Sequence, residues 1–272
     1  MSRRVAMSAR LRALDVRDRY LSRPPRADRL VPPRRLQFVG HSDFVETGEE
    51  FAGHLERLVG LRPSDAVLDV GCGIGRMARP LTRVLDPQAG GRYDGFDVNV
   101  DGIGWCRRRY RRHPHFRFRV ADLFNARYNP GGTHTAADYR FPYPGGSFDV
   151  VLCTSVLTHL LEAEADHYLA EIARCLKPGG RVLATFFLLN DTSRTLIEDG
   201  VAHFPFLDAE EEVAILDEAM PEEAVAYADE WVFRTLRRHG LTLIGLHPGS
   251  WCGREEHLSF QDVIVAEREA YA

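Results

Sequence analysis

Lysine is almost absent from this chain of 272 residues, since Lys177 is its one lysine among 35 lysine and arginine residues. The cysteines number five and contain no C-x-x-C pair: Cys72, Cys106, Cys153, Cys175 and Cys252. Their scattered spacing excludes a disulfide framework and the common zinc patterns, so a reducing cytoplasm is the expected location. No apolar run approaches the roughly 18 residues of a membrane-spanning helix, and we expect no membrane partner.

What is present is an ordinary globular composition, with 44% hydrophobic and 27% charged residues. The charge is unevenly spread. Residues 1–35 hold eleven arginines against three aspartates, a local charge of +8 in a chain whose net charge is −4. We interpret this stretch as a basic, proline- and arginine-rich N-terminal arm with a possible helix, in which Leu11, Leu14 and Leu21 share one face. Contact with an anionic partner and a role as a transit peptide are the alternatives.

Apolar runs with the period of strands alternate with helical patterns from residue 66 onward. Strands are expected over 66–71, 93–98, 116–122, 148–156, 181–189, 241–248 and 262–267. Helices are expected over 75–85, 102–112, 161–176 and 221–240. Strands that alternate with single helices form a parallel sheet covered on both faces, whereas the last two strands have no helix between them. The sequence therefore predicts an α/β fold with a Rossmann-like, doubly wound sheet of seven strands, mostly parallel with an antiparallel last strand.

Two segments, 125–147 and 190–221, are too long to be simple connections. Loops of that length in a compact domain are usually functional or disordered. We expect them to be insertions that form a small helical cap on one domain spanning residues 36–272.

Three glycines, Gly71, Gly73 and Gly75, follow the first strand in the run LDVGCGIGR. Such a cluster marks a backbone that bends sharply or lies against something, and in open α/β sheets ligands bind beyond the carboxyl ends of the strands. Together with Ala78, the last two glycines fit the dinucleotide pattern G-x-G-x-x-G/A, which is a weak signal alone. A nicotinamide oxidoreductase is therefore one interpretation of this turn.

The run from Asp69 to Gly75, D-x-G-x-G-x-G, resembles motif I of the class I S-adenosylmethionine-dependent methyltransferases, in particular the small-molecule members called type 11. The similarity continues in FPYPGGSFDVVLCTSVLTHL, which looks like the family's fourth-strand region. It also includes YLAEIARCLKPGGRVLATFF, which looks like the following helix and fifth strand. The resemblance covers residues 36–267, and the order of its motifs is a much stronger signal than any one of them.

S-adenosyl-L-methionine is the cofactor that this resemblance implies, bound by the acid and glycines of motif I. Asp97, which closes the second strand, would accept hydrogen bonds from both ribose hydroxyls, with Val98 beside it. Asp122 would meet the adenine amino group and Leu123 the ring, and Thr154 follows the fourth strand at the same edge. A carboxylate suits the ribose because hydroxyls are donors and each carboxylate oxygen accepts.

Missing motifs argue against several methyl acceptors. The chain has no [DNS]-P-P-[YFW] run, which is typical of amino-methylating nucleic-acid enzymes, and no Pro-Cys nucleophile, which a carbon-5 pyrimidine methyltransferase needs. Its one lysine cannot supply the K-D-K-E set of ribose methyltransferases. The acidic body also disfavours nucleic acid. Metal-dependent O-methyltransferases have Asp-Asn after the fifth strand, whereas this chain has Asn190 and then Asp191. Mg²⁺ prefers more carboxylate ligands than this pair supplies. We therefore expect no metal and a small-molecule substrate.

His159, in the segment that leaves the fourth strand, is the candidate general base, because histidine titrates near neutral pH. The alternative is a histidine that only packs or shapes the pocket, since methyl transfer can rely on proximity. His203, Asp191 and His41 are weaker candidates. The run HFPFLD (203–208) and Trp231 fit either an apolar acceptor pocket or the core of the cap. Residues 35–44 would fold over the cofactor or form a lead-in helix.

These observations favour a cytoplasmic methyltransferase that acts on a hydroxyl of a sugar-like or natural-product acceptor. N-methylation of a small amine and a non-catalytic cofactor-binding protein are the alternatives. The sequence does not indicate an oligomeric state.

Overall fold

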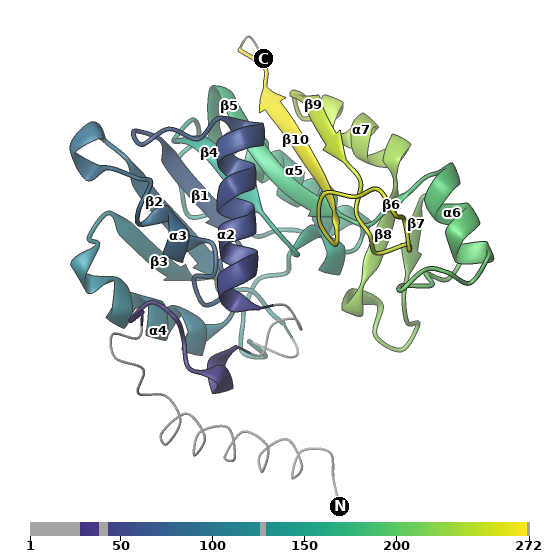
Figure 1. Ribbon diagram of the computed structural model, residues 1–272, viewed down its shortest axis with the longest axis horizontal. Coiled ribbons are helices and arrows are strands. Elements are labelled where there is room, and N and C mark those ends of the chain that lie inside the picture. Colours follow the sequence, from purple (N-terminus) through teal and green to yellow (C-terminus); the bar gives the residue numbers. More distant parts are fainter. Residues whose placement is uncertain (1–27, 38–42, 126–128, 271–272) are drawn as a thin grey trace, which may run out of the picture.

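A seven-stranded sheet forms the body of the protein in the computed structural model, which describes residues 28–37, 43–125 and 129–270 (Figure 1). Its order is β3-β2-β1-β4-β5-β10-β9. The strands are β1 (Ala66–Val70), β2 (Arg92–Asp97), β3 (Phe116–Val120), β4 (Phe148–Cys153), β5 (Leu176–Phe186), β9 (Leu241–His247) and β10 (Asp262–Arg268). The first five are parallel, and β10 runs antiparallel to both β5 and β9. The predicted sheet, with its antiparallel last strand, is confirmed.

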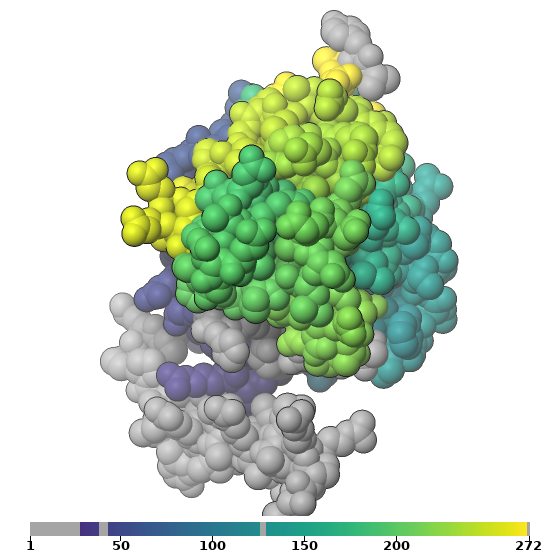
Figure 2. All heavy atoms as spheres, turned by 90° about the vertical axis from the view of Figure 1, so that its right-hand side faces the viewer, coloured from purple at the N-terminus to yellow at the C-terminus, as the bar shows by residue number. Residues whose placement is uncertain are grey.

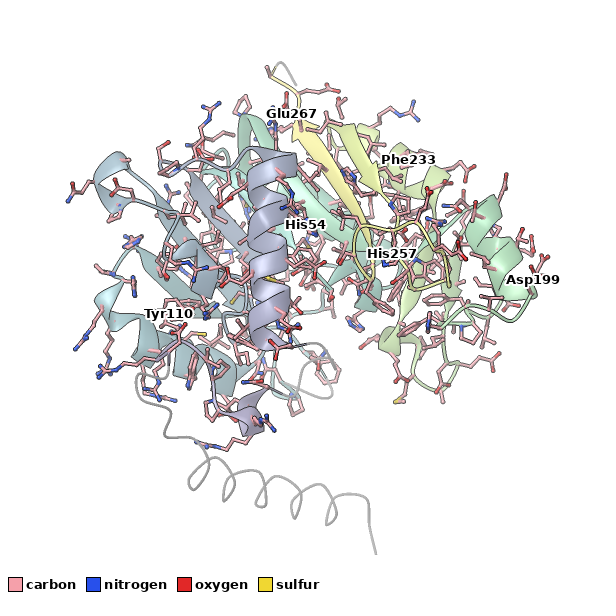
Figure 3. The ribbon with its side chains drawn as sticks, in the orientation of Figure 1. His54, Tyr110, Asp199, Phe233, His257 and Glu267 are labelled. Carbon is pink, nitrogen blue, oxygen red and sulfur yellow. The ribbon has the colours of Figure 1, made fainter. Side chains whose placement is uncertain are left out.

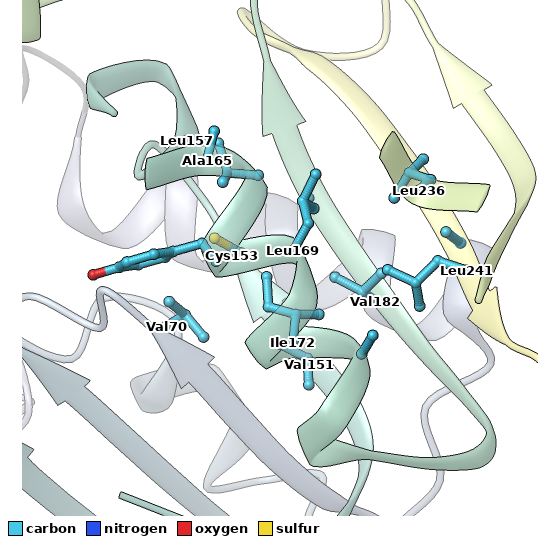
Figure 4. Close-up of a cluster of buried hydrophobic side chains, with 14 of the residues drawn as sticks. Val70, Val151, Cys153, Leu157, Ala165, Leu169, Ile172, Val182, Leu236 and Leu241 are labelled. Carbon is cyan, nitrogen blue, oxygen red and sulfur yellow. The ribbon is translucent and has the colours of Figure 1, made fainter. Parts of the chain in front are cut away.

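Helices cover both faces of this sheet. They are α2 (Phe44–His54), α3 (Ala78–Leu81), α4 (Val100–Arg109), α5 (Glu162–Cys175) and α7 (Asp229–Arg238), with the short helices η1 (Arg34–Leu36), η2 (Leu55–Val59), η3 (Pro87–Ala89), η4 (Tyr110–Arg112) and η5 (Leu157–His159). Successive strand residues point to opposite faces. On β5, for example, Leu183 packs in the cluster under α2 to α4, while Val182 and Ala184 pack with α5 and α7 (Figure 4).

The cap is built on a second sheet of three strands in the order β6-β8-β7. Its elements are β6 (Leu188–Leu189), α6 (Asp191–Glu198), β7 (Val213–Ile215), η6 (Pro221–Glu223) and β8 (Val225–Ala228). The expectation of a helical cap therefore holds for α6 but misses the sheet. In Figure 2 the green cap faces the viewer, and in Figure 3 Asp199 marks its outer end, away from His54 on α2.

The helix predicted over 221–240 is wrong in its first half. Residues 225–228 form β8, and the helix begins only at Asp229. All four residues of β8, Val-Ala-Tyr-Ala, are buried. A strand buried on both faces has no polar alternation, so its pattern cannot be told from that of a buried helix.

Residues 129–147 pack against α5 through its charged pair. Glu171 accepts the backbone N–H of Phe141 at 2.7 Å and two guanidinium bonds from Arg174. Arg174 in turn donates to the carbonyl of Tyr143. This insertion is thus fastened to the body of the domain, and its aromatic residues belong to the core. The helix predicted within the basic arm lies outside the described residues.

Candidate cofactor and acceptor site

The glycine turn lies at the carboxyl end of β1, and the backbone N–H groups of Gly71 and Cys72 both donate to the carbonyl of Phe96 at 3.0 Å. Gly71, Gly73 and Gly75 all have positive φ, at 75°, 53° and 78°, which favours glycine. A Cβ on Gly71 would lie 2.2 Å from Val156 Cγ2, whereas a Cβ on Gly73 would meet nothing within 4 Å. The turn therefore presses on the segment after β4 at Gly71 and faces open space at Gly73.

Asp97, at the end of β2, is joined to this turn. Its Oδ2 accepts the N–H of Gly73 and its Oδ1 the N–H of Asn99, both at 2.8 Å. Each oxygen keeps a further lone pair. Burial raises the pKa of Asp97, and the two backbone donors oppose that shift. Val98 follows, half-buried.

Asp69 is buried beneath the turn, with 1% of its surface exposed. Its Oδ2 accepts the hydroxyl of Tyr93 at 2.5 Å, while its Oδ1 has no partner in the described part of the chain. Burial raises the pKa of Asp69 to about 7, with the nearby charge of Asp97 adding to the shift and the Tyr93 hydroxyl opposing it. A buried carboxylate oxygen without a donor is costly, which points to a group that completes it.

Asp122 follows β3 and is exposed, whereas Leu123 beside it is buried. The carboxylate accepts the hydroxyl of Thr133 at 2.6 Å and its backbone N–H at 3.1 Å. These bonds lower the pKa of Asp122. The described part of the 125–147 insertion thus begins by folding back onto the predicted adenine acid.

The segment after β4 carries Thr154, which is half-buried, and Ser155, which has a positive φ of 52°. The Ser155 N–H donates to Thr185 Oγ1 at 2.8 Å, and the Ser155 hydroxyl donates to Gln261 Oε1 at 2.9 Å. A positive φ outside glycine is uncommon and clusters at functional sites.

His159 is exposed at the end of η5, and its Nδ1 lies 3.0 Å from the backbone carbonyl of Glu222 in the cap. A carbonyl only accepts, so Nδ1 carries the proton of this bond. In the neutral ring, Nε2 then keeps its lone pair. The geometry leaves a free base nitrogen and also gives the ring a structural bond.

Two of the weaker candidates lie in the cap. His203 and Asp191 are exposed in the cap, and His41 lies outside the described residues. Trp231 is buried, and its Nε1 donates to Glu162 at 2.9 Å. Phe206 is buried in the aromatic cluster of the cap. Of the two interpretations of these aromatic residues, the structure supports core.

The residues present fit a nucleoside-bearing cofactor with a charged end. Gly73 faces open space, Asp97 has lone pairs beside it, and Asp69 Oδ1 lacks a donor. Within the described ranges, no three His, Cys, Asp or Glu side chains are grouped to hold a metal ion. No helix of the described residues is both long and apolar enough to cross a bilayer.

Residues 68–184 match the family model of a methyltransferase domain. These residues carry a methyltransferase domain, and the fold around them is that of the class I S-adenosylmethionine-dependent methyltransferases. It is 35% identical over 119 residues to a fatty-acid O-methyltransferase of Mycolicibacterium smegmatis, a match that covers 44% of this chain and 36% of the relative. It is also 35% identical over 150 residues to phthiotriol/phenolphthiotriol dimycocerosates methyltransferase 1 of Mycobacterium ulcerans, covering 53% of this chain and 43% of the relative. The matches thus span less than half of these relatives.

Solved structures show the same methyltransferase fold. A protein of Pyrococcus horikoshii has a TM-score of 0.55 at 17% identity, over 93% of this chain and 99% of that one. The 1,6-didemethyltoxoflavin-N1-methyltransferase of Burkholderia thailandensis, solved with S-adenosylhomocysteine, has a TM-score of 0.52 at 17% identity, over 97% and 88% of the two chains. At these identities the likeness extends to the fold.

Several residues that contact the candidate site are not predicted from the sequence. Tyr93 holds Asp69, Val156 backs Gly71, and Gln261 reaches the segment after β4 from far along the chain. No local pattern predicts these contacts, because each joins residues on or beside different strands of the sheet that are distant in the sequence.

Proposed function

We propose that this domain transfers the methyl group of S-adenosylmethionine to an oxygen of a small molecule, and that it extends over residues 36–272. The observation that carries the proposal is the carboxylate of Asp97 held against Gly73, with open space beyond that glycine. When bound, the cofactor would supply a methyl group on a positively charged sulfur, which an acceptor oxygen could displace.

The chain's own residues supply alignment and desolvation. Asp97 would accept the ribose hydroxyls with its remaining lone pairs, and Asp69 would meet the cationic end of the cofactor. Asp122 and Leu123 would hold the adenine, with Val98 and Thr154 completing the wall and Gly75 holding the turn against α4.

The acceptor oxygen is a hydroxyl in our proposal, as in a sugar-like or natural-product acceptor, and His159 Nε2 would take its proton. The two curated relatives named above act on a fatty acid and on phthiotriol-type lipids according to their names, which supports an oxygen acceptor on an apolar body. A carboxylate acceptor would have no proton to lose, so a requirement for His159 separates the two kinds of oxygen.

Calorimetric titration with S-adenosylhomocysteine tests the cofactor site. We expect the wild-type chain to bind and Asp97→Ala to lose about thirtyfold or more in affinity, since two buried hydroxyls lose their acceptor at about 2–4 kcal/mol. Asp101→Ala, an exposed acid on α4, is the matched control and should bind like the wild type. Absence of binding by the wild-type chain would refute the proposal.

A further inference from the structure

Three polar residues meet on the side of the glycine turn that lies away from Asp97. The sheet places β4, β5 and β10 in succession beyond β1, on the side away from Asp97. Ser155 follows β4, Thr185 lies near the end of β5, and Gln261 immediately precedes β10. Thr185 is paired with Val263, two residues after Gln261. The three side chains therefore share the ligand-binding edge of the sheet.

Their hydrogen bonds form a closed set. Ser155 N–H donates to Thr185 Oγ1 at 2.8 Å, Thr185 Oγ1 donates to Gln261 Oε1 at 2.6 Å, and Ser155 Oγ donates to the same Oε1 at 2.9 Å. The Thr185 hydroxyl is fully buried and already accepts a bond, so its proton requires an acceptor. For this reason the amide oxygen of Gln261 must face Thr185, and the amide nitrogen must point away from it.

The amide nitrogen of Gln261 is left with two N–H donors. It has no hydrogen-bond partner in the described part of the chain, and it is not among the enclosed atoms that lack one, so it reaches solvent. The amide oxygen of Gln261 accepts two hydrogens, from Ser155 Oγ and Thr185 Oγ1, so both of its lone pairs are used. What the Gln261 amide offers a ligand is therefore donors held in a fixed orientation.

An apolar surface adjoins these donors. Phe260 precedes Gln261 and is 45% exposed. The centroid of its ring lies 5.6 Å from that of Phe204 and 6.3 Å from that of Phe187, and both contacts are edge to face. Ligand sites combine aromatic side chains with a few oriented polar groups, and Phe260 and Gln261 supply one of each on consecutive residues.

We propose that the amide N–H groups of Gln261, fixed by Ser155 and Thr185, bind the methyl acceptor through an oxygen, with the apolar body of the acceptor against Phe260. Donors select an oxygen with lone pairs and reject an ammonium group, which has only protons to offer. This proposal rests on the proposed function and narrows it to oxygen acceptors. The oxygen belongs to a carboxylate or to a hydroxyl, and the experiment distinguishes the two.

The experiment measures binding of octanoate, octan-1-ol and octylamine, which share one apolar body, to the protein saturated with S-adenosylhomocysteine. We expect at least one oxygen probe to bind tenfold tighter than octylamine to the wild-type chain at pH 7.5. Gln261→Glu keeps an oxygen for Ser155 and Thr185 but replaces the free donors by an anionic oxygen. We expect this variant to bind the oxygen probe tenfold more weakly than the wild-type chain and octylamine more tightly. Its affinity for S-adenosylhomocysteine should stay within twofold of the wild-type value.

Gln88→Glu makes the same chemical change in the exposed η3 and should alter none of the affinities. Gln261→Met removes the donors and the acceptor together, so it should lose the preference for the oxygen probe without binding octylamine more tightly. This variant keeps the test decisive if Gln261→Glu folds poorly. If His159→Asn still methylates octanoate, the acceptor is a carboxylate. If His159→Asn no longer methylates octan-1-ol, the acceptor is a hydroxyl.

Preference of the wild-type chain for octylamine overturns the proposal, as does an oxygen-to-amine ratio that Gln261→Glu leaves unchanged. Failure of all three probes to bind the cofactor-loaded protein overturns it as well. Failure of the wild-type chain to bind S-adenosylhomocysteine is a different result, since it refutes the proposed function instead.

Discussion

Asp69 carries a carboxyl group that the fold has removed from water. Burial raises its pKa from 3.8 to about 7, so the native state holds the proton more tightly than the unfolded chain does. The contribution of this group to the free energy of unfolding is then fully present below about pH 4 and is lost as the pH rises to 7. The loss amounts to a few kcal/mol, because one pKa unit corresponds to about 1.4 kcal/mol.

Asp69→Asn removes this titration. We expect the unfolding free energy of the wild-type chain to fall more between pH 5 and pH 8 than that of the variant, whatever the baseline cost of the amide. Urea denaturation at both pH values measures the two differences. An equal change in both proteins would contradict the raised pKa.

Gly71 and Gly73 form a matched pair for substitution. Both have positive φ, so alanine costs each about 1–2 kcal/mol in backbone strain. At Gly71 the new Cβ also meets Val156 at 2.2 Å, while at Gly73 it enters open space. We expect Gly71→Ala to lower the free energy of unfolding clearly more than Gly73→Ala, measured by urea denaturation.

Gly73→Ala tests what the open space is for. We expect it to weaken S-adenosylhomocysteine binding at least tenfold in calorimetry, because its Cβ occupies the space beside Asp97. Cofactor binding at wild-type affinity in this variant would show that the space serves something else.

At the scale of elements, the sequence predicts the strands of the main sheet well because most are runs of β-branched and apolar residues between turns, while β3 alternates apolar residues with arginine. It predicts the glycine turn and Asp97 because both depend on one strand-turn-helix unit. The cap strands β6 and β8 escape prediction, since they have two and four residues and no polar alternation. Their pairing is decided by tertiary contact with β5 and α7.

The same limit applies to the candidate site. Asp69, Asp97 and the glycines are read from local spacing, whereas Ser155, Thr185 and Gln261 meet only because β4, β5 and β10 are neighbours. The position of His159 after β4 follows from the sequence, but its bond to the carbonyl of Glu222 depends on how the cap folds.

Asp262 joins the cap to the main sheet at the start of β10. It is buried and accepts three bonds, from Leu188 N–H at 2.8 Å, Gly249 N–H at 2.8 Å and Trp251 Nε1 at 2.6 Å. Asp262→Ala leaves these three donors unpaired, so we expect a loss of about 3 kcal/mol or more in urea denaturation. Asp199→Ala, at the exposed end of α6, should stay within about 0.5 kcal/mol of the wild type.

At the scale of the whole molecule, the cap contacts the segment that backs the glycine turn. The hydroxyl of Tyr227 on β8 donates to the carbonyl of Leu160 and lies 3.4 Å from that of Leu157, and the carbonyl of Glu222 accepts from His159. Val156, one residue before η5, lies against Gly71. A chain of contacts therefore runs from the cofactor side of the turn to the cap.

Hydrogen exchange with and without S-adenosylhomocysteine tests whether this chain of contacts transmits binding. In the wild-type protein we expect protection at 71–75 and also at 157–160 and 222–228, because ordering the turn restrains Val156 and the segment bound to the cap. Tyr227→Phe removes the hydroxyl that joins them, so protection should remain at 71–75 and fall in the other two ranges. Tyr143→Phe, whose buried hydroxyl has no hydrogen-bond partner in the described chain, should behave like the wild type. Equal cap protection in Tyr227→Phe and the wild type would show that the cap responds to the cofactor by another route.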